Sequence, residues 1–209
     1  MSMLPLILTD VSLWRDGNTL IAGVSVTFSP GTNTIVLGHN GAGKSLLLRI
    51  CHGLMGPDSG SVAWAEKSPE GHRRQAMVFQ KPIMLRRSVR SNVTYRLKVN
   101  GVPKLRRQEI AHMNLKRVGL ADIASRPAAV LSGGEQQRVA IARAIAMKPE
   151  LILADEPTGN LDTENSDMIS KILFRYVKEE SSSLIMVTHD PKLANRASRK
   201  IKIKDGKIK

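Results

Sequence analysis

The sequence predicts an α/β fold: a core with a mainly parallel sheet, an antiparallel β subdomain at the N-terminal end and an inserted α-helical subdomain. Three observations support this. Short apolar runs suited to strands alternate with segments of helical spacing, which is typical of a parallel sheet. A glycine-rich loop separates one such strand from a helix. A basic stretch without a long apolar strand then interrupts the alternation.

The first half of the chain supplies most of the strands. Asp16–Asn18 is a run of turn residues between two alternating apolar segments, which predicts an antiparallel pair. A short β-branched run after Pro30-Gly31 is suited to a buried strand. We therefore predict strands over Leu6–Trp14, Val24–Phe28, Thr34–Leu37 and Met77–Phe79, and a helix over Ser45–Leu54.

The second half contains the helical insertion. Residues from about Pro82 to Val130 hold no long apolar strand, and we expect a helical subdomain at about 82–146 within a single domain, 1–209. An Asp-Gly pair between alternating residues predicts a closing hairpin. The elements predicted here are helices over Lys104–Val118, Gly134–Met147 and Glu164–Lys178, strands over Leu151–Ala154 and Leu184–Val187, and the hairpin over Ile201–Ile208.

Length and composition restrict the class of protein. A chain of 209 residues can bury a core and suits one domain. No apolar run approaches the roughly 18–20 residues that span a bilayer, and the N-terminus lacks the basic region of a signal peptide. The single cysteine, Cys51, excludes an internal disulfide and fits a reducing compartment. We therefore expect a protein of the cytosol without a membrane-spanning segment.

Positive charge is the strongest compositional feature. The formal net charge is +14, and basic residues gather in two runs, Lys81–Arg107, which contains no acid, and Lys192–Lys209. Such runs occur on nucleic-acid surfaces, on faces toward anionic lipid headgroups and on ordinary solvated surfaces. Aromatic residues make up 3% of the chain, which argues against stacking on single-stranded nucleic acid. We favour a solvated or membrane-proximal surface, and nucleic acid is not expected as a partner.

The glycine-rich loop has the residues of a phosphate-binding site. It follows the strand at 34–37 and has the sequence Gly38-His39-Asn40-Gly41-Ala42-Gly43-Lys44-Ser45. Gly41 and Gly43 allow successive backbone N–H groups to point at an anion, and the start of the next helix adds partial positive charge. Lys44 would reach the β- and γ-phosphates of a nucleotide, and the Ser45 hydroxyl would bind Mg²⁺.

Two further segments carry chemistry. Asp155 and Glu156 close a buried strand, at the sheet edge where ligands of α/β proteins bind, and we expect Asp155 to hold Mg²⁺ directly or through water. Ser132-Gly133-Gly134 opens a helix with Ser132 as its cap, and a helix start with two glycines is a second anion site. A single nucleotide does not require two phosphate cradles from one chain.

Three segments follow one another along the chain: the phosphate loop, Leu131–Arg138, and the acid pair after Leu151–Ala154. In this order they resemble the ATP-binding subunit of ATP-binding-cassette (ABC) transporters. The resemblance covers essentially the whole chain and implies a P-loop NTPase core that binds ATP and Mg²⁺ and hydrolyses ATP. In the family, the signature of one copy covers the ATP held by the phosphate loop of the other. The resemblance therefore implies a homodimer with two ATP molecules at its interface. It also implies a peripheral location at the cytoplasmic face of the membrane, on integral membrane permease subunits.

The same resemblance assigns roles to single residues. Glu156 polarises the attacking water, Gln80 matches the Q-loop glutamine that senses Mg²⁺ and this water, and His189 matches the switch histidine that contacts the γ-phosphate. The residues expected at the metal are Ser45, Gln80 and Asp155. Those expected against nucleotide are Gly38, His39, Asn40, Gly41, Ala42, Gly43, Lys44, Ser45, Leu46, Ser132, Gly133, Gly134, Gln136 and, at the D-loop position, Asp162.

Two positions depart from the usual family pattern, and a third has alternatives. His39 stands where proline is commoner, and Leu46 replaces a hydroxyl residue that often touches the α-phosphate. Both changes can weaken nucleotide affinity, and neither removes an essential group. Trp14 is the best candidate for stacking on adenine. The alternatives are that Arg15 occupies this position or that Trp14 is buried.

The two halves of the chain resemble different transporter types. Residues 78–89 resemble importers of tungstate or related oxyanions, whereas 151–162, 186–190 and 204–207 resemble lipoprotein-releasing and macrolide-export ATPases. In the family, the region after the Q-loop glutamine contacts the coupling helix of the membrane subunit, where partner choice is expected. We therefore favour import of an oxyanion such as tungstate, molybdate or phosphate, which adds an extracytoplasmic solute-binding protein to the partners. The alternative is a lipoprotein-releasing or macrolide-export ATPase.

Two other classes of function are weighed against transport. Soluble cassette ATPases that act on nucleic acid or ribosomes would suit the positive charge. They usually carry long coiled coils or two fused cassettes, however, and this chain has no sustained heptads. A nucleotide-binding scaffold without turnover is disfavoured because Lys44, Asp155, Glu156 and His189 are all present.

Overall fold

The computed structural model describes residues 2–65 and 74–209. The chain forms two compact units. The first comprises Met1–Met77, Glu150–Glu156 and Ser181–Lys209, and the second comprises Val78–Pro149 and Pro157–Glu180.

An antiparallel sheet of three strands, in the order β2-β1-β4, forms one layer of the first unit. Its strands are β1 (Leu6–Arg15), β2 (Asn18–Phe28) and β4 (Ser59–Trp64). The predicted N-terminal pair is confirmed, although β2 begins at Asn18 rather than Val24, because it keeps pairing with β1 as far as the turn. The sequence does not predict β4, because its first three residues, Ser59, Gly60 and Ser61, are small and exposed and the apolar alternation of a strand is missing.

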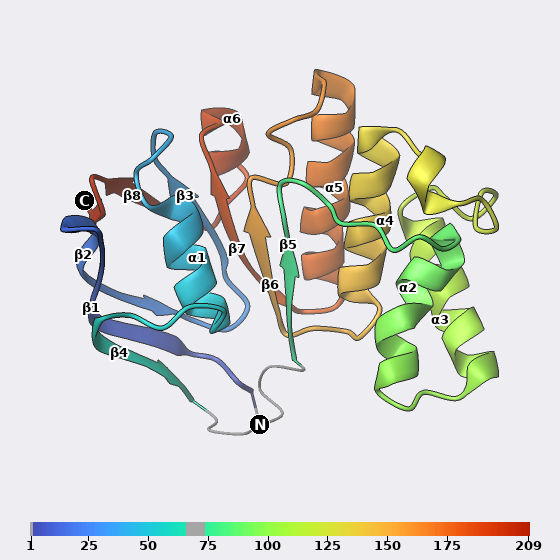
Figure 1. Ribbon diagram of the computed structural model, residues 1–209, viewed down its shortest axis with the longest axis horizontal. Coiled ribbons are helices and arrows are strands. Elements are labelled where there is room, and N and C mark those ends of the chain that lie inside the picture. Colours follow the sequence, from blue (N-terminus) through green and yellow to red (C-terminus); the bar gives the residue numbers. More distant parts are fainter. Residues whose placement is uncertain (1, 66–73) are drawn as a thin grey trace. The chain divides into compact units, whose positions relative to one another are not determined.

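A mainly parallel sheet forms the other layer, as predicted. Its strands are β3 (Asn33–Leu37), β5 (Gln75–Val78), β6 (Leu151–Asp155), β7 (Ser183–Thr188), β8 (Arg199–Lys204) and β9 (Lys207–Ile208). They lie in the order β5-β6-β7-β3-β8-β9 (Figure 1). β3 pairs in parallel with β7 and β8, and β6 with β7, so the carboxyl ends of β3, β6 and β7 meet at one edge. β9 returns antiparallel to β8 as the predicted hairpin.

One apolar core joins both sheets to α1 (Lys44–His52), the helix after the glycine-rich loop. Leu47, Leu48 and Cys51 of this helix are buried together with Leu6 of β1 and Leu153 of β6. Burial raises the pKa of the Cys51 thiol to about 12, so this thiol stays protonated and unreactive. The packing fixes the position of α1 and thereby the loop that precedes it. A one-turn helix, α6 (Pro191–Ala194), follows β7.

The second unit is helical. It contains α2 (Val89–Val99), α3 (Lys104–Arg117), the 3₁₀ turn η2 (Ala128–Val130), α4 (Gly133–Ile145) and α5 (Thr163–Glu179). The predicted ranges of α3, α4 and α5 are confirmed to within two residues. The sequence does not predict α2, because its buried apolar side chains are limited to Val89, Val93 and Leu97. In the part of the chain that the structure describes, no helix combines the length and apolar character needed to cross a membrane.

Candidate active site

The glycine-rich loop connects β3 to α1 and approaches neighbouring backbone closely. Gly41 and Gly43 have positive φ values of 82° and 96°, which side-chain-bearing residues rarely adopt. A Cβ atom at Gly43 would lie 2.8 Å from Ile21 Cδ1 and 2.9 Å from the Leu20 carbonyl oxygen. The loop can therefore keep this shape only with glycine at residue 43.

The start of α1 offers capacity for an anion. Gly43 is the N-cap residue, and among the described residues no side chain caps this helix and no acid lies in its first turn. The first N–H groups of a helix lack partners within the helix, and its dipole places partial positive charge there. Combined with the positive-φ glycines, this geometry suits a phosphate group.

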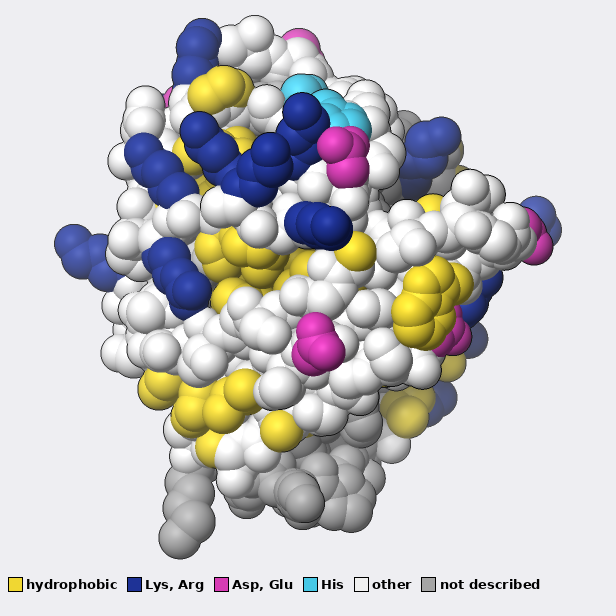
Figure 2. Space-filling model, turned by 90° about the vertical axis from the view of Figure 1, so that its left-hand side faces the viewer, with side chains coloured by type: hydrophobic (Ala, Val, Ile, Leu, Met, Phe, Trp, Pro, Cys, Tyr) yellow, Lys and Arg dark blue, Asp and Glu magenta, His cyan; other side chains and the backbone are white. Residues whose placement is uncertain are grey.

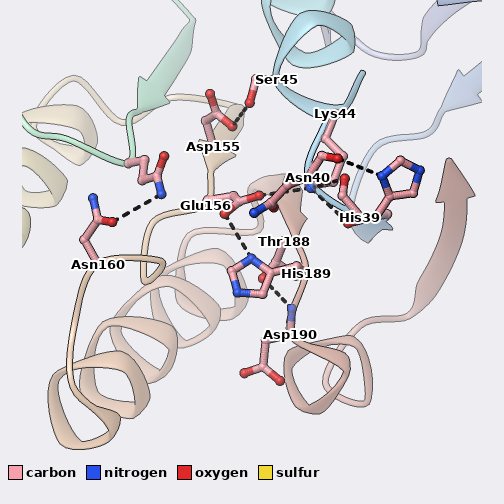
Figure 3. A network of polar contacts seen from close by, with 12 residues as sticks. His39, Asn40, Lys44, Ser45, Asp155, Glu156, Asn160, Thr188, His189 and Asp190 are labelled. Carbon is pink, nitrogen blue, oxygen red and sulfur yellow. Dashed lines mark hydrogen bonds and ion pairs between the residues drawn. The ribbon is translucent and has the colours of Figure 1, made fainter. Parts of the chain in front are cut away.

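The ammonium group of Lys44 is drawn into the loop. Its Nζ donates to the carbonyl oxygens of Gly38 and His39, each at 2.9 Å, and lies 3.0 Å from Glu156 Oε1. The Lys44 side chain is 4% exposed, and a cation so far removed from water requires such oxygen partners. Lys44 therefore presents a buried positive charge at the predicted phosphate site (Figure 3).

Ser45 and Asp155 face each other at the predicted metal site. Ser45 Oγ donates a 2.6 Å hydrogen bond to Asp155 Oδ1, and Asp155 is 6% exposed at the end of β6. Parallel pairing of β6 with β7 and of β7 with β3 brings Asp155 to the loop that follows β3. Two adjacent hard oxygen groups fit Mg²⁺, which proteins hold through one or two carboxylates together with substrate phosphates.

Glu156 links the loop to the end of β7. Its Oε1 faces Lys44, and its Oε2 lies 3.0 Å from His189 Nδ1 (Figure 3). Glu156 has a φ of 42°, and its N–H donates to the Val187 carbonyl at 3.0 Å. A non-glycine residue at positive φ costs about 1 kcal/mol or more, and such strain clusters at functional sites.

The three side chains Lys44, Glu156 and His189 form one polar chain that can perform acid–base chemistry. Lys44 supplies a cation, Glu156 a carboxylate that can accept a proton, and His189 a titratable ring. The Glu156 side chain is 12% exposed and that of His189 is 53% exposed. His189 therefore lies where both the carboxylate and a group arriving from solvent can contact it.

His39, the residue in place of proline, contacts the closing hairpin. Its Nδ1 lies 2.7 Å from the Asn40 carbonyl oxygen, and its Nε2 lies 3.4 Å from Asp205 Oδ1. The next residue, Gly206, donates its N–H to the Ala42 carbonyl at 3.2 Å. The turn between β8 and β9 therefore supports the phosphate loop.

Trp14 and Arg15 differ in their surroundings. Arg15 Nη1 lies 3.2 Å from Asp58 Oδ2 and donates to the Trp14 carbonyl at 2.6 Å. The Trp14 N–H donates to Asp58 Oδ2 at 2.6 Å, which lowers the pKa of that carboxyl group. Trp14 is 42% exposed, so the alternative of a buried Trp14 is wrong, and its ring keeps surface for stacking. Leu46, the other departure from the family pattern, packs against the apolar core.

Gln80 lies in the second unit, directly after β5 and Phe79. Its Nε2 donates to Asn160 Oδ1 at 3.5 Å. Gln137 of α4 donates to the Phe79 carbonyl at 3.0 Å, so the helix that begins with the signature holds the backbone next to Gln80. The proposed role of Gln80 at the metal remains a prediction.

The signature residues begin α4 through a reciprocal capping box. The Ser132 side chain accepts the Glu135 N–H, and the Glu135 carboxylate accepts the Ser132 N–H at 2.8 Å, which lowers the pKa of Glu135. Gln136 Nε2 donates to the Leu131 carbonyl at 2.9 Å. These bonds fix the two glycines in the first turn of the helix.

Gly134 lies against Asn165, which connects it to Asp162. A Cβ atom at Gly134 would lie 2.4 Å from Asn165 Oδ1. Asn165 donates to Asp162 twice, from its N–H and from Nδ2, each at 2.8 Å, and these bonds hold the pKa of Asp162 below its usual value. One amide side chain therefore joins the signature to the D-loop position.

Replacing Gly134 with Ala should destabilise the second unit by about 1–3 kcal/mol, because the added methyl group displaces Asn165 from Asp162. Urea unfolding measures this loss. Gly133→Ala is the matched control, since its Cβ would meet only Leu161 Cδ2, at 3.8 Å. In N165A, which already lacks the amide side chain, adding G134A should cost much less stability than it costs in the wild type. If G134A costs as much in N165A as in the wild type, contact with Asn165 is not the cause.

Sequence reasoning missed Asn165 and Asp205. No motif identifies either residue, because each acts through a partner far along the chain: Gly134 for Asn165 and His39 for Asp205. The Asp-Gly pair does predict the hairpin turn. Only the pairing of β8 with β3, however, places that turn beside the phosphate loop.

Residues 21–159 match the model of the ABC transporter family. The chain is 40% identical over 207 residues to the lipoprotein-releasing system ATP-binding protein LolD of Syntrophus aciditrophicus, covering 93% of each chain. It is 38% identical over 181 residues to the tungstate uptake system ATP-binding protein TupC of Peptoclostridium acidaminophilum, covering 86% of this chain and 85% of that protein.

The fold is also shared with solved structures. The cassette MJ0796, in a dimeric post-hydrolysis state bound to ADP and Pi, superposes with a TM-score of 0.86 at 30% identity. The match covers 98% of this chain and 96% of that one. The predicted fold class is therefore confirmed.

Proposed function

This chain belongs to the ABC transporter family and is an ATP-binding, ATP-hydrolysing cassette; from this premise we propose that it drives a solute through separate membrane permease subunits, at the cytoplasmic face of the membrane. The observation that carries the proposal is the buried ammonium group of Lys44, held between the loop carbonyls and Glu156. A nucleoside triphosphate is the ligand that this charge and loop fit.

Lys44 is expected to exchange Glu156 for phosphate oxygens when ATP binds. Glu156 can then accept a proton from the attacking water. His189, whose Nδ1 lies 3.0 Å from the Glu156 carboxylate, would orient that carboxylate and contact the γ-phosphate. Ser45 and Asp155, with Gln80, would hold Mg²⁺, which would neutralise charge on the phosphates. Trp14 would stack on the adenine.

The proposed assembly is a homodimer with two ATP molecules at its interface. Each copy has two helix starts that we assign to nucleotide: the uncapped start of α1 behind the phosphate loop, and the start of α4 at Ser132, Gly133 and Gly134, where Glu135 completes a capping box. Pairing the loop of one copy with the signature of the other gives each ATP both cradles. Gln136 and Asp162 would lie at the same interface, and the related cassette MJ0796 is described as a dimer.

Import of an oxyanion is the transport activity that we favour. The segment after Gln80 resembles tungstate importers, and TupC is a tungstate uptake protein. Arg143 of α4 donates to the Ile83 carbonyl at 2.9 Å, and the Ile83 side chain is 75% exposed. The segment is therefore held through the backbone of Ile83 and exposes part of its side chains, as contact with a permease requires; the exposed residues are Lys81, Ile83, Arg86 and Arg87.

Lipoprotein release or macrolide export is the second candidate. Its support is the 40% sequence identity to LolD, in an alignment that covers 93% of each chain. This relative and TupC differ little in identity, so relatedness alone does not separate import from export.

A strain that lacks this chain should accumulate less tungsten and molybdenum from low external concentrations, by about tenfold or more, as measured by mass spectrometry of washed cells. The wild-type chain should restore uptake, and Lys44→Ala should not, because it lacks the phosphate-binding cation. Unchanged metal content together with lipoproteins retained in the inner membrane would contradict oxyanion import and support the second candidate.

A further inference from the structure

The closing hairpin carries four lysines on one face. Lys204 of β8 pairs with Lys207 of β9, and the Lys209 N–H donates to the Lys202 carbonyl at 2.9 Å, which places Lys209 opposite Lys202. Side chains two residues apart on a strand share a face, so all four point to the same side. The intervening Ile203 is 2% exposed and faces the core. We call Lys202, Lys204, Lys207 and Lys209 the lysine array.

Charge repulsion opposes this arrangement. Directly opposed side chains in an antiparallel pair have Cβ atoms about 4.5–5.5 Å apart, and like charges placed there are destabilising. Along each strand the lysines repeat about every 6.8 Å. The nearby acid Asp205 faces His39, and none of the four lysines forms an ion pair within the described residues. An external anion would therefore relieve a repulsion that the fold leaves in place.

The lysine array is part of a wider basic face. Figure 2, viewed from the side on which β8 and the C-terminus lie in Figure 1, shows Lys and Arg side chains gathered there. Lys200 precedes the array on the same side of β8, and its Nζ donates to Asn195 Oδ1 at 3.0 Å. Arg199 alternates to the other side of β8, where its guanidinium donates to the Thr27 carbonyl. Lys200 therefore extends the basic face of β8 by one residue beyond the lysine array.

We propose that the lysine array binds the headgroups of anionic phospholipids and holds the cassette against the membrane. This rests on the proposed function, which places the chain beside a membrane permease. Basic clusters on membrane-facing surfaces are attracted to anionic lipid at short range. The array contains no aromatic side chain, the feature on which single-stranded nucleic acid stacks. Four exposed lysines on one side of a two-stranded hairpin suit a layer of phosphate groups.

The test compares vesicle binding by two variants of equal net charge. K202Q/K204Q removes half of the lysine array, and K116Q/K178Q removes two exposed lysines from helices of the second unit. The probes are vesicles of phosphatidylcholine alone and of phosphatidylcholine with about one third phosphatidylglycerol, with binding measured by co-sedimentation. Each lysine contributes roughly fivefold in affinity, so K202Q/K204Q should bind the anionic vesicles roughly 25-fold more weakly than wild type. The control should bind like wild type, and neither variant should lose ATPase activity.

Three outcomes would overturn the proposal. Equal weakening in both variants would show attraction by net charge alone. Unchanged binding in K202Q/K204Q would show that the array does not contact lipid. If K202Q/K204Q lost binding to an oligonucleotide but retained binding to vesicles, the array would be assigned to nucleic acid. In each case, retained ATPase activity leaves the proposed transport function standing, whereas wild-type protein without ATPase activity would contradict that function instead.

Discussion

Replacing Glu156 with Gln is expected to lower the turnover number for ATP by about a hundredfold to ten-thousandfold, because the amide cannot accept a proton from the attacking water. The substitution keeps the size of the side chain, and the amide oxygen can still face Lys44. ATP should therefore bind and remain intact. The variant is expected to accumulate as an ATP-loaded dimer, since hydrolysis is the step that reopens it.

Phosphate release in the presence of Mg²⁺ and ATP measures the first effect, and light scattering with ATP or ADP measures the second. Glu164→Gln is a matched control, because it removes the same charge from an exposed residue in the first turn of α5. Turnover in E156Q equal to that of the control would remove Glu156 from its role as the base.

Replacing Ser132 with Arg is expected to stop turnover while leaving the binding of a single nucleotide intact. Ser132 is the N-cap of α4 and is not a residue of the phosphate loop, so the loop of the same copy keeps all of its own groups. In the proposed dimer, however, the long cationic side chain would occupy the space of the nucleotide held by the other copy. The dimer would therefore fail to close, and hydrolysis would fall to background.

The matched control for this prediction is Ser132→Ala. Both substitutions remove the capping oxygen, which costs about 1 kcal/mol of helix stability, but only Arg adds bulk. Binding of a fluorescent ATP analogue and steady-state ATPase activity separate the two effects. Normal hydrolysis by S132R would rule out a site built from two copies.

The contacts around the phosphate loop are those that the sequence predicts best. Short apolar runs predict β3, β6 and β7, and parallel pairing brings the residues at their carboxyl ends together. The predictions therefore anticipate that Ser45, Asp155, Glu156 and His189 meet, and the structure brings them within hydrogen-bonding distance in pairs. This prediction succeeds because the end of a parallel strand fixes where the next side chains lie. No detailed knowledge of side-chain packing is needed to make it.

The missed features depend on contacts that no local pattern encodes. β4 is held by pairing with β1 rather than by its own apolar side chains. α2 buries Asn92, a polar residue whose side-chain hydrogen bonds include one to the Leu85 carbonyl, so its buried face does not look apolar in the sequence. Arg15 is engaged by Asp58, which lies 43 residues away along the chain. For β4 and Arg15 the decisive partner is distant in sequence, whereas for α2 the burial of a polar side chain hides the helical pattern.

The position of β3 has a consequence for how the protein is made. β3 lies between β7 and β8, and Gly206 supports Ala42 of the phosphate loop. All of these partners are translated more than a hundred residues after the loop itself. On the ribosome, the phosphate loop of a nascent chain therefore lacks the strands that flank β3 and the Gly206 contact until β7, β8 and the turn after β8 have emerged.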